Sequence, residues 1–151
     1  MTLVDPVGGR EAGYGATAMI FRRKTMPPRL QQPHAAFESQ AERVETARKA
    51  LLSCLPTGRV GRAPVPVGLE LLSDELVAVR EELEAWRVPE MEERWQACAK
   101  AVDLALARIP EGLERAHDTE EAGVLLNVVS GIVGPLDTWA SAERAWLKLR
   151  E

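Results

Sequence analysis

The chain has 151 residues, of which 46% are hydrophobic and 28% charged, and its net charge is −4. These values are ordinary for a single globular domain. The charge is uneven, because residues 1–32 hold five basic and two acidic groups, which leaves −7 for residues 33–151. An acidic body argues against a dedicated nucleic-acid surface, since binding to phosphates needs clustered positive charge.

Residues 1–32 are rich in glycine and proline and poor in large apolar side chains. This composition predicts a flexible, disordered and mildly basic leader in front of a helical domain at 33–151. Its basic tail consists of Arg22, Arg23, Lys24 and Arg29, and the predicted loop from Thr57 to Pro66 adds Arg59 and Arg62. The stretch from Met19 to Lys24 offers at most a weak contact with an anionic membrane, because one short patch anchors poorly. A solvated tail is the favoured interpretation.

The first two helices are predicted at 34–55 and 67–87. The first follows Pro33, a residue tolerated in a helix's first turn, and ends before Pro56. The second has large apolar residues spaced alternately three and four apart, which is the pattern of a helix packed along a neighbour. These residues are Leu69, Leu72, Leu76, Val79, Leu83 and Trp86.

The third helix is predicted at 89–117. The apolar repeat of the second helix fails after Trp86 and restarts at Met91, and the slip coincides with Val88-Pro89. Proline disfavours a helical residue before it and suits the first turn of a new helix. Such a short connection predicts an antiparallel helical hairpin. Whether the third helix bends or ends at Pro110 is left open by the sequence.

The fourth helix is predicted at 119–150, with Asp118 as its N-cap. Its first half is apolar almost all round, from Val124 to Leu136, so it is expected inside the bundle or between subunits. Asn127 and Ser130 interrupt this run, which is shorter than the roughly 20 apolar residues of a membrane span. Pro135 cannot donate a hydrogen bond to the carbonyl of Gly131 and therefore predicts a kink.

Together these patterns predict an all-α fold: a four-helix, mostly antiparallel bundle with a kinked C-terminal helix and a disordered N-terminal leader. We expect the tryptophans to lie on the apolar sides of their helices.

One pattern could bind a metal. Glu114 and His117 form Glu-x-x-His at helical spacing, with Glu111 one turn earlier. Carboxylate bundles hold two metal ions with two such motifs and two further carboxylates. The only other histidine, His34, has no glutamate three residues before it, so the expected reading of this motif is an exposed helix end, and no metal or cofactor is predicted.

The sequence lacks the motifs of common catalytic sites. It has no Gly-x-Ser-x-Gly elbow, no phosphate-binding glycine loop and no strand–helix alternation. Cys54 and Cys98 follow apolar helical faces, as inert buried thiols do. Two distant cysteines and no signal-peptide pattern favour a reducing, cytoplasmic location. We therefore expect no enzyme.

The last turns of the chain offer the one arguable partner site, formed by Trp139, Trp146 and Leu149. Core packing is favoured for Trp139, whereas core and docking surface are equally supported for Trp146, because terminal helices are often uncovered on one side. The leading hypothesis is a non-catalytic interaction or scaffold protein that self-associates or docks a protein partner. The alternatives are a carboxylate-bundle metal protein and a tail-mediated binder of nucleic acid or anionic membrane.

Overall fold

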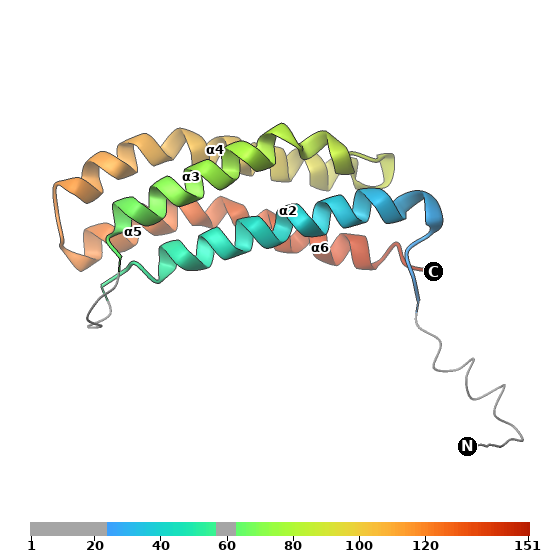
Figure 1. Ribbon diagram of the computed structural model, residues 1–151, viewed down its shortest axis with the longest axis horizontal. Coiled ribbons are helices and arrows are strands. Elements are labelled where there is room, and N and C mark those ends of the chain that lie inside the picture. The colour runs from blue at the N-terminus through green and yellow to red at the C-terminus, as the bar shows by residue number, and fades with distance from the viewer. Residues whose placement is uncertain (1–23, 57–62) are drawn as a thin grey trace, which may run out of the picture.

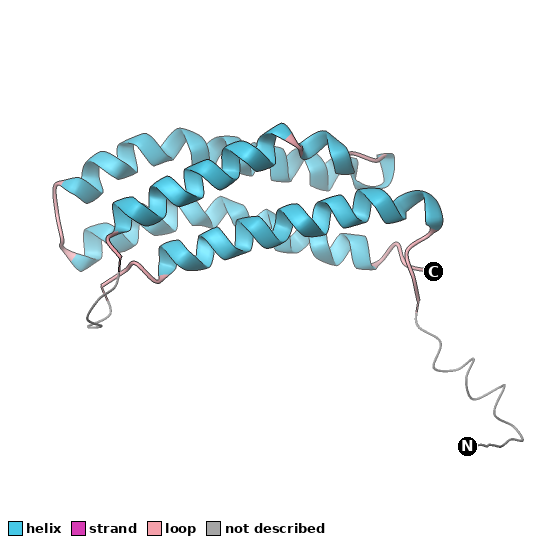
Figure 2. Cartoon of the chain, in the orientation of Figure 1, coloured by secondary structure: helices cyan, strands magenta, loops and turns pink. Residues whose placement is uncertain are grey.

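The computed structural model describes residues 24–56 and 63–151, and all regular structure within these ranges is helical (Figure 2). Four helical rods pack against one another, the last of them joined from pieces (Figure 1). The α-helices are α2 (Pro28–Leu52), α3 (Val65–Glu81), α4 (Glu92–His117), α5 (Ala122–Val133) and α6 (Thr138–Leu147). The predicted all-α, four-helix architecture is confirmed.

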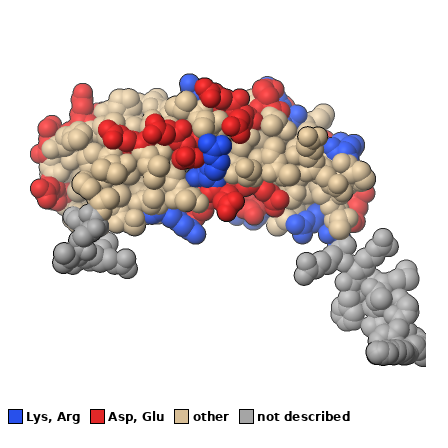
Figure 3. All heavy atoms as spheres, viewed as in Figure 1, with Lys and Arg blue, Asp and Glu red and all other residues tan. Residues whose placement is uncertain are grey.

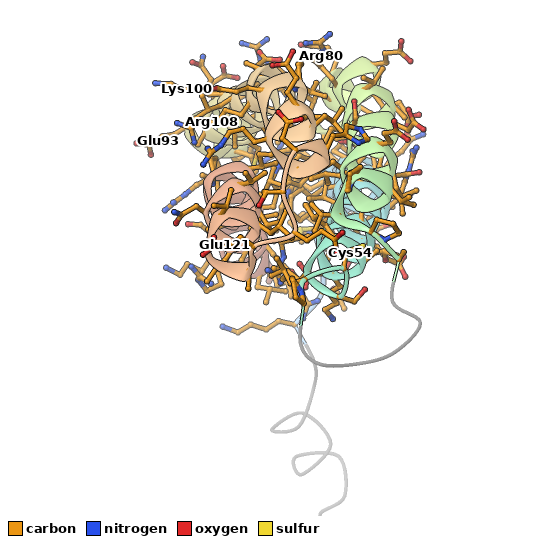
Figure 4. All side chains as sticks on the ribbon, turned by 90° about the vertical axis from the view of Figure 1, so that its left-hand side faces the viewer. Cys54, Arg80, Glu93, Lys100, Arg108 and Glu121 are labelled. Atoms are coloured by element: carbon orange, nitrogen blue, oxygen red, sulfur yellow. The ribbon has the colours of Figure 1, made fainter. Side chains whose placement is uncertain are left out.

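The rods run alternately up and down, so successive rods are antiparallel (Figure 1). α2 packs on α3, α3 on α4, and α4 on both α5 and α6. Viewed along the rods, they occupy the corners of a square, with α3 diagonally opposite α5 (Figure 4). α5 is therefore one of four corners, and within the single chain it is not buried on all sides, because Leu126 is 52% exposed.

α2 begins at Pro28, earlier than the predicted 34, because the chain before it is tied down. Met26 and Leu30 bury their side chains in the core. Thr25 and Glu151 exchange two backbone hydrogen bonds, with nitrogen-to-oxygen distances of 2.9 and 2.8 Å. The described part of the predicted leader, from Lys24 onward, thus pairs with the C-terminal residue at one end of the bundle (Figure 1). Residues 1–23 lie outside the described residues.

The predicted hairpin between the second and third rods is present. The α3 rod ends in the 3₁₀ helix η1 (Leu83–Trp86), and the 3₁₀ helix η2 (Pro89–Met91) leads into α4. Val88 is extended, with φ −128° and ψ 153°, as the residue before a proline tends to be. α4 then continues through Pro110 to His117, which settles the point that the sequence left open.

α5 is capped differently from the prediction. Asp118 ends α4 as its C-cap, so it is not available as the N-cap of the next helix. Glu121 is the N-cap instead, and its carboxylate accepts a hydrogen bond from the Val124 N–H at 2.9 Å. The Thr119 hydroxyl in turn accepts the Glu121 N–H at 3.0 Å. The acidic run does cap a helix, three residues later than expected.

The predicted kink lies between α5 and α6, where the 3₁₀ helix η3 (Gly134–Asp137) joins them. Pro135 has no N–H to offer the Gly131 carbonyl. The Arg108 guanidinium on α4 donates to that carbonyl instead, at 2.7 Å. A side chain from the neighbouring rod thereby satisfies the backbone group that the proline leaves open.

An aromatic cluster fills the core where α2 meets η1 and α6. Phe37 packs edge-on to Trp86 at 4.9 Å and is stacked with Trp139 at 5.7 Å between ring centroids. Gln40 is buried beside them, accepting from the Trp86 indole N–H at 2.9 Å and donating to the Glu82 carbonyl at 2.7 Å. The amide therefore supplies the acceptor for the buried Trp86 N–H. It is also a second donor to the Glu82 carbonyl, which accepts the Ala85 N–H at 3.1 Å as well.

The joined stretch from Ala122 to Leu147 meets the length and composition of a membrane span, with a mean hydropathy of 1.2 in its 18-residue window. The apolar run that ends at Leu136 is shorter than a span, but the helical stretch as a whole has 26 residues. Core helices of soluble proteins meet the same criterion, so it is weak support for a span. Only 39% of that window is buried, so much of this apolar stretch lies at the surface of the bundle.

Candidate functional site

The outward side of α5 forms a surface without charge. The helix packs Leu125, Val128, Val129 and Ile132 into the core, and the opposite residues reach solvent. We call the exposed residues the α5 face: Ala122, Gly123, Leu126, Asn127, Ser130, Gly131 and Gly134. The sequence places no charged residue between positions 122 and 136, whereas outward-facing helix surfaces usually carry charged side chains.

The α5 face has one large apolar side chain among small ones. Leu126 is 52% exposed. Gly131 and Gly134 have open space where a β-carbon would lie. A groove of 210 Å³ runs along the edge that α5 shares with α4, with Gly112 and Asn127 among its lining residues. A leucine that protrudes beside glycines without side chains gives a surface against which another helix can pack.

Charged side chains of α4 border the α5 face. Arg108, Glu111 and Arg115 line the groove and are exposed, and Arg108 projects on the side where α4 and α5 meet (Figure 4). Asp118 follows at the end of α4. Every ion pair between described residues lies within residues 29–103. The border charges therefore have no ion-pair partner in the described part of the chain.

The predicted partner residues lie elsewhere. Trp139 and Trp146 are 4% and 0% exposed, and both belong to the aromatic cluster with Phe37. Their indole N–H groups are buried and have no hydrogen-bond acceptor among the described residues. Leu149 is partly buried against the core. The structure thus places both tryptophans where a partner would reach them only if α6 moved.

The candidate metal ligands do not converge. Glu111, Glu114 and His117 are all exposed at the end of α4. Glu111 lines the groove beside α5, whereas His117 lines a different one, shared with Cys54 and Leu125. No three His, Cys, Asp or Glu side chains come together as a metal site anywhere in residues 24–56 and 63–151. The geometry therefore gives the metal alternative no support.

Two of the four residues of the predicted basic tail, Arg22 and Arg23, fall outside the described residues, as do Arg59 and Arg62 of the predicted loop. Lys24 is exposed. Arg29 forms an ion pair with Glu90 beside the hairpin, so its charge is partly neutralised within the bundle. Where the structure describes the tail, it shows one exposed cation and one paired cation.

The cysteines lie in the interior. Burial raises the pKa of the Cys98 thiol to about 12, and a thiol that stays protonated is a poor nucleophile. Cys54 is 5% exposed, and its thiol donates to the Ala50 carbonyl at 3.3 Å.

Three comparisons with known proteins were made, and no family model, no curated protein and no solved structure matches this chain. The α5 face is therefore interpreted from its own residues.

The apolar run predicted a helix inside the bundle or between subunits, but it did not indicate which side of that helix would be exposed. The small and polar residues Gly123, Asn127, Ser130 and Gly134 fall on one side at helical spacing, and that arrangement was the available signal.

Proposed function

We propose that this chain is a non-catalytic helical interaction protein that self-associates through the α5 face. The proposal rests on one observation: the exposed surface of α5 has no charged residue along its length and presents a half-exposed leucine, Leu126. Exposed apolar surface next to polar residues is characteristic of interaction sites. A second copy of the chain is the partner that needs no further component.

The proposal is consistent with what surrounds the face. The cores of protein interfaces are depleted in charged residues, and charged residues gather at their rims. The α5 face has this composition, with its charges confined to the neighbouring α4 side chains. A cytoplasmic location, as expected from the sequence, belongs to the same proposal.

Size-exclusion chromatography with light scattering tests the proposal. We expect the full chain to have a mass near twice 16.6 kDa at high concentration and to approach the monomer mass on about hundredfold dilution, because dimerisation follows mass action. A mass that stays at the monomer value across this range would refute self-association.

Two alternatives give distinct results. Binding to nucleic acid or anionic vesicles through Arg22, Arg23 and Lys24 would weaken strongly as salt rises and would be lost on deleting residues 1–24. Docking of a different protein would leave the pure chain monomeric. Neither result is expected if the chain pairs with itself through α5.

A further inference from the structure

We infer that residues 16–23 of this chain dock in the groove between α2 and the η3–α6 part of the last rod, which we call the α2–α6 groove. In this arrangement Met19, Ile20 and Phe21 cover the floor of the groove. Arg22 and Arg23 meet its rim. The inference concerns a contact of the leader with its own bundle and does not depend on self-association through the α5 face.

The floor of the α2–α6 groove is apolar. The groove has a volume of 390 Å³, and both rods contribute to its floor through Ala41, Val44, Leu136, Trp139 and Ala140. Val44, Leu136 and Trp139 are only 2%, 3% and 4% exposed, so the floor is the outer surface of the packed core. Apolar side chains laid over this floor leave water, which favours docking.

The rim of the α2–α6 groove is acidic. It carries the carboxylates of Glu45, Asp137 and Glu143 and one guanidinium, that of Arg48. Arg48 is paired with Glu45 at 2.8 Å. Asp137 and Glu143 form no ion pair with another described residue. The rim therefore favours a segment that brings its own positive charge.

The groove on the other side of α2 suits a basic segment less well. It lies between α2 and α3 and has a volume of 300 Å³. Its guanidinium, that of Arg43, contacts Glu75 at 2.9 Å and Glu82 at 3.6 Å. Among the residues that line it, only the carboxylate of Glu42 has no such partner in the described chain, against two carboxylates on the α2–α6 rim.

The described chain begins at the end of the bundle where α6 ends. Thr25 pairs there with the C-terminal residue (Figure 1). At about 1.5 Å per helical residue, Glu143 and Asp137 lie about 12 and 21 Å from that pair along the last rod. At about 3.3 Å per extended residue, Phe21 can reach about 13 Å from Thr25, and Ala16 about 30 Å. The segment between them can therefore span the groove, with residues left for the chain to turn toward it.

The sequence of the segment matches the groove in order. Residues 16–21 carry no charge and include three large apolar side chains, and Arg22 and Arg23 follow directly. These arginines are within about 7–10 Å of Thr25 in extended chain, so their side chains can reach Glu143, the rim carboxylate nearest this end. A short tether gives the segment an effective concentration in the millimolar range. A contact of modest strength is then sufficient for docking.

Disulfide formation within one chain tests the docking. Phe21→Cys combined with Ala140→Cys, in the full chain, can crosslink only when the two Cβ atoms approach to about 4 Å. Under mild oxidation of dilute monomer, we expect this pair to crosslink at least about tenfold faster than the control pair. Peptide mass mapping identifies the disulfide, and the buried Cys54 and Cys98 are present in both variants.

The control pair is Phe21→Cys with Ser39→Cys. Ser39 is exposed and lines the groove between α2 and α3. It lies about 16 Å along α2 from Pro28, and Ala140 lies about 16 Å along the last rod from Glu151. The two positions are therefore at similar distances from Thr25 and differ in the groove to which they belong.

Charge reversal tests the rim. Glu143→Arg in the Phe21–Ala140 cysteine pair should slow crosslinking about threefold or more, because like charges then oppose Arg22 and Arg23. Glu70→Arg makes the same change in charge at an exposed position of α3 and should leave the rate unchanged. The difference between the two should shrink at high salt. Circular dichroism of each variant checks that the helices remain folded.

The outcomes separate this inference from self-association, which is measured on the wild-type chain. Equal crosslinking rates for the Ala140 and Ser39 pairs overturn the docking, because a solvated segment would meet both positions equally. A covalent dimer as the main product of the Ala140 pair assigns the groove to the leader of a second copy and overturns docking within one chain. Equal effects of Glu143→Arg and Glu70→Arg overturn recognition of the arginines by the rim.

Discussion

The α2–α3 side and the α5 side of the bundle are both built from helices that bury one face, but the surfaces that they expose differ. Between α2 and α3, Arg43 contacts Glu75 at 2.9 Å and Glu82 at 3.6 Å, and charged side chains spread across this side (Figure 3). The α5 face has none. Exposed ion pairs add little stability, typically 0–1 kcal/mol each, so their presence chiefly marks a surface that stays in water.

The two sides also differ beneath the surface. α2 contributes Phe37 and Gln40 to the aromatic cluster, where rings and a buried amide fix their neighbours. α5 contributes aliphatic side chains and meets α4 at Gly112, where a β-carbon would lie 2.9 Å from Ile132 and 3.1 Å from Val128. The α2 contact therefore depends on ring packing and hydrogen bonds between particular side chains, whereas the α4–α5 contact depends on how closely the two helix backbones approach.

Truncating one residue on each side gives the largest contrast. Phe37→Ala should lower the free energy of unfolding by about 3–5 kcal/mol, because it opens a cavity in the core. Leu126→Ala should change it by less than about 0.5 kcal/mol when measured on the dilute monomer. Urea denaturation followed by circular dichroism measures both, and a large loss from Leu126→Ala would show that α5 is packed inside the single chain.

Removing the buried amide should have the next largest effect. Gln40→Met keeps the volume but leaves the buried Trp86 N–H without its acceptor, while the Glu82 carbonyl keeps only the Ala85 N–H at 3.1 Å. We therefore expect a loss of about 1–3 kcal/mol. Gln32→Met, at an exposed position of the same helix, is the matched control and should be nearly neutral. Similar losses from both would show that the hydrogen bonds of Gln40 do not stabilise the fold.

Adding one methyl group distinguishes a tight contact from an open one. Gly68→Ala on α3 puts a β-carbon 2.9 Å from the Cys54 sulfur and 3.1 Å from the Leu51 Cα, and should cost about 1–3 kcal/mol. Gly131→Ala on α5 meets nothing within 4 Å and should gain up to about 1 kcal/mol from helix propensity. Thermal unfolding of dilute samples measures both, and destabilisation by Gly131→Ala would contradict an uncovered α5.

Rod positions, connections and the kink could be predicted from sequence because each depends on local rules. The slip at Val88-Pro89 located the hairpin, and Pro135 located the bend. The early start of α2 could not be predicted, since it depends on Thr25 meeting Glu151 at the other end of the chain. The donor to the Gly131 carbonyl is also distant in sequence, and nothing local singles out Arg108.

The candidate site was predicted in part. The sequence indicated the last rod as the place of association, and the proposed face does lie on it, at α5 instead of Trp146 and Leu149. Periodicity shows which residues share a side, but an apolar run such as Val124 to Val133 does not reveal which of its sides a neighbour covers. That depends on the square arrangement of the rods, which leaves Leu126 outside and Val129 inside.

Lowering the pH should weaken the ion-paired hairpin, and this is the smallest of the expected effects. Hydrogen bonds from Arg87 and, to a lesser extent, Gln96 lower the pKa of Glu92 to about 2. A lowered pKa in the folded state contributes stability that is present above the unfolded value of about 4.5 and is lost as the pH falls toward 2. Between pH 4.5 and pH 2 the hairpin should therefore lose the stabilisation that Glu92 provides.

The matched variants are Glu92→Gln and Glu114→Gln, both on α4. Glu92→Gln should flatten the decline in stability over this range, whereas Glu114→Gln should leave it unchanged, because Glu114 forms no ion pair with a described residue. Because the Glu92 side chain is 41% exposed, the effect should be small and should shrink further at high salt. Carbon-13 NMR titration of the Glu92 carboxyl measures its pKa directly. An ordinary pKa would show that Arg87 does not stabilise the ionised carboxylate. Ion pairing would then contribute as little to the hairpin as it does to the α5 face.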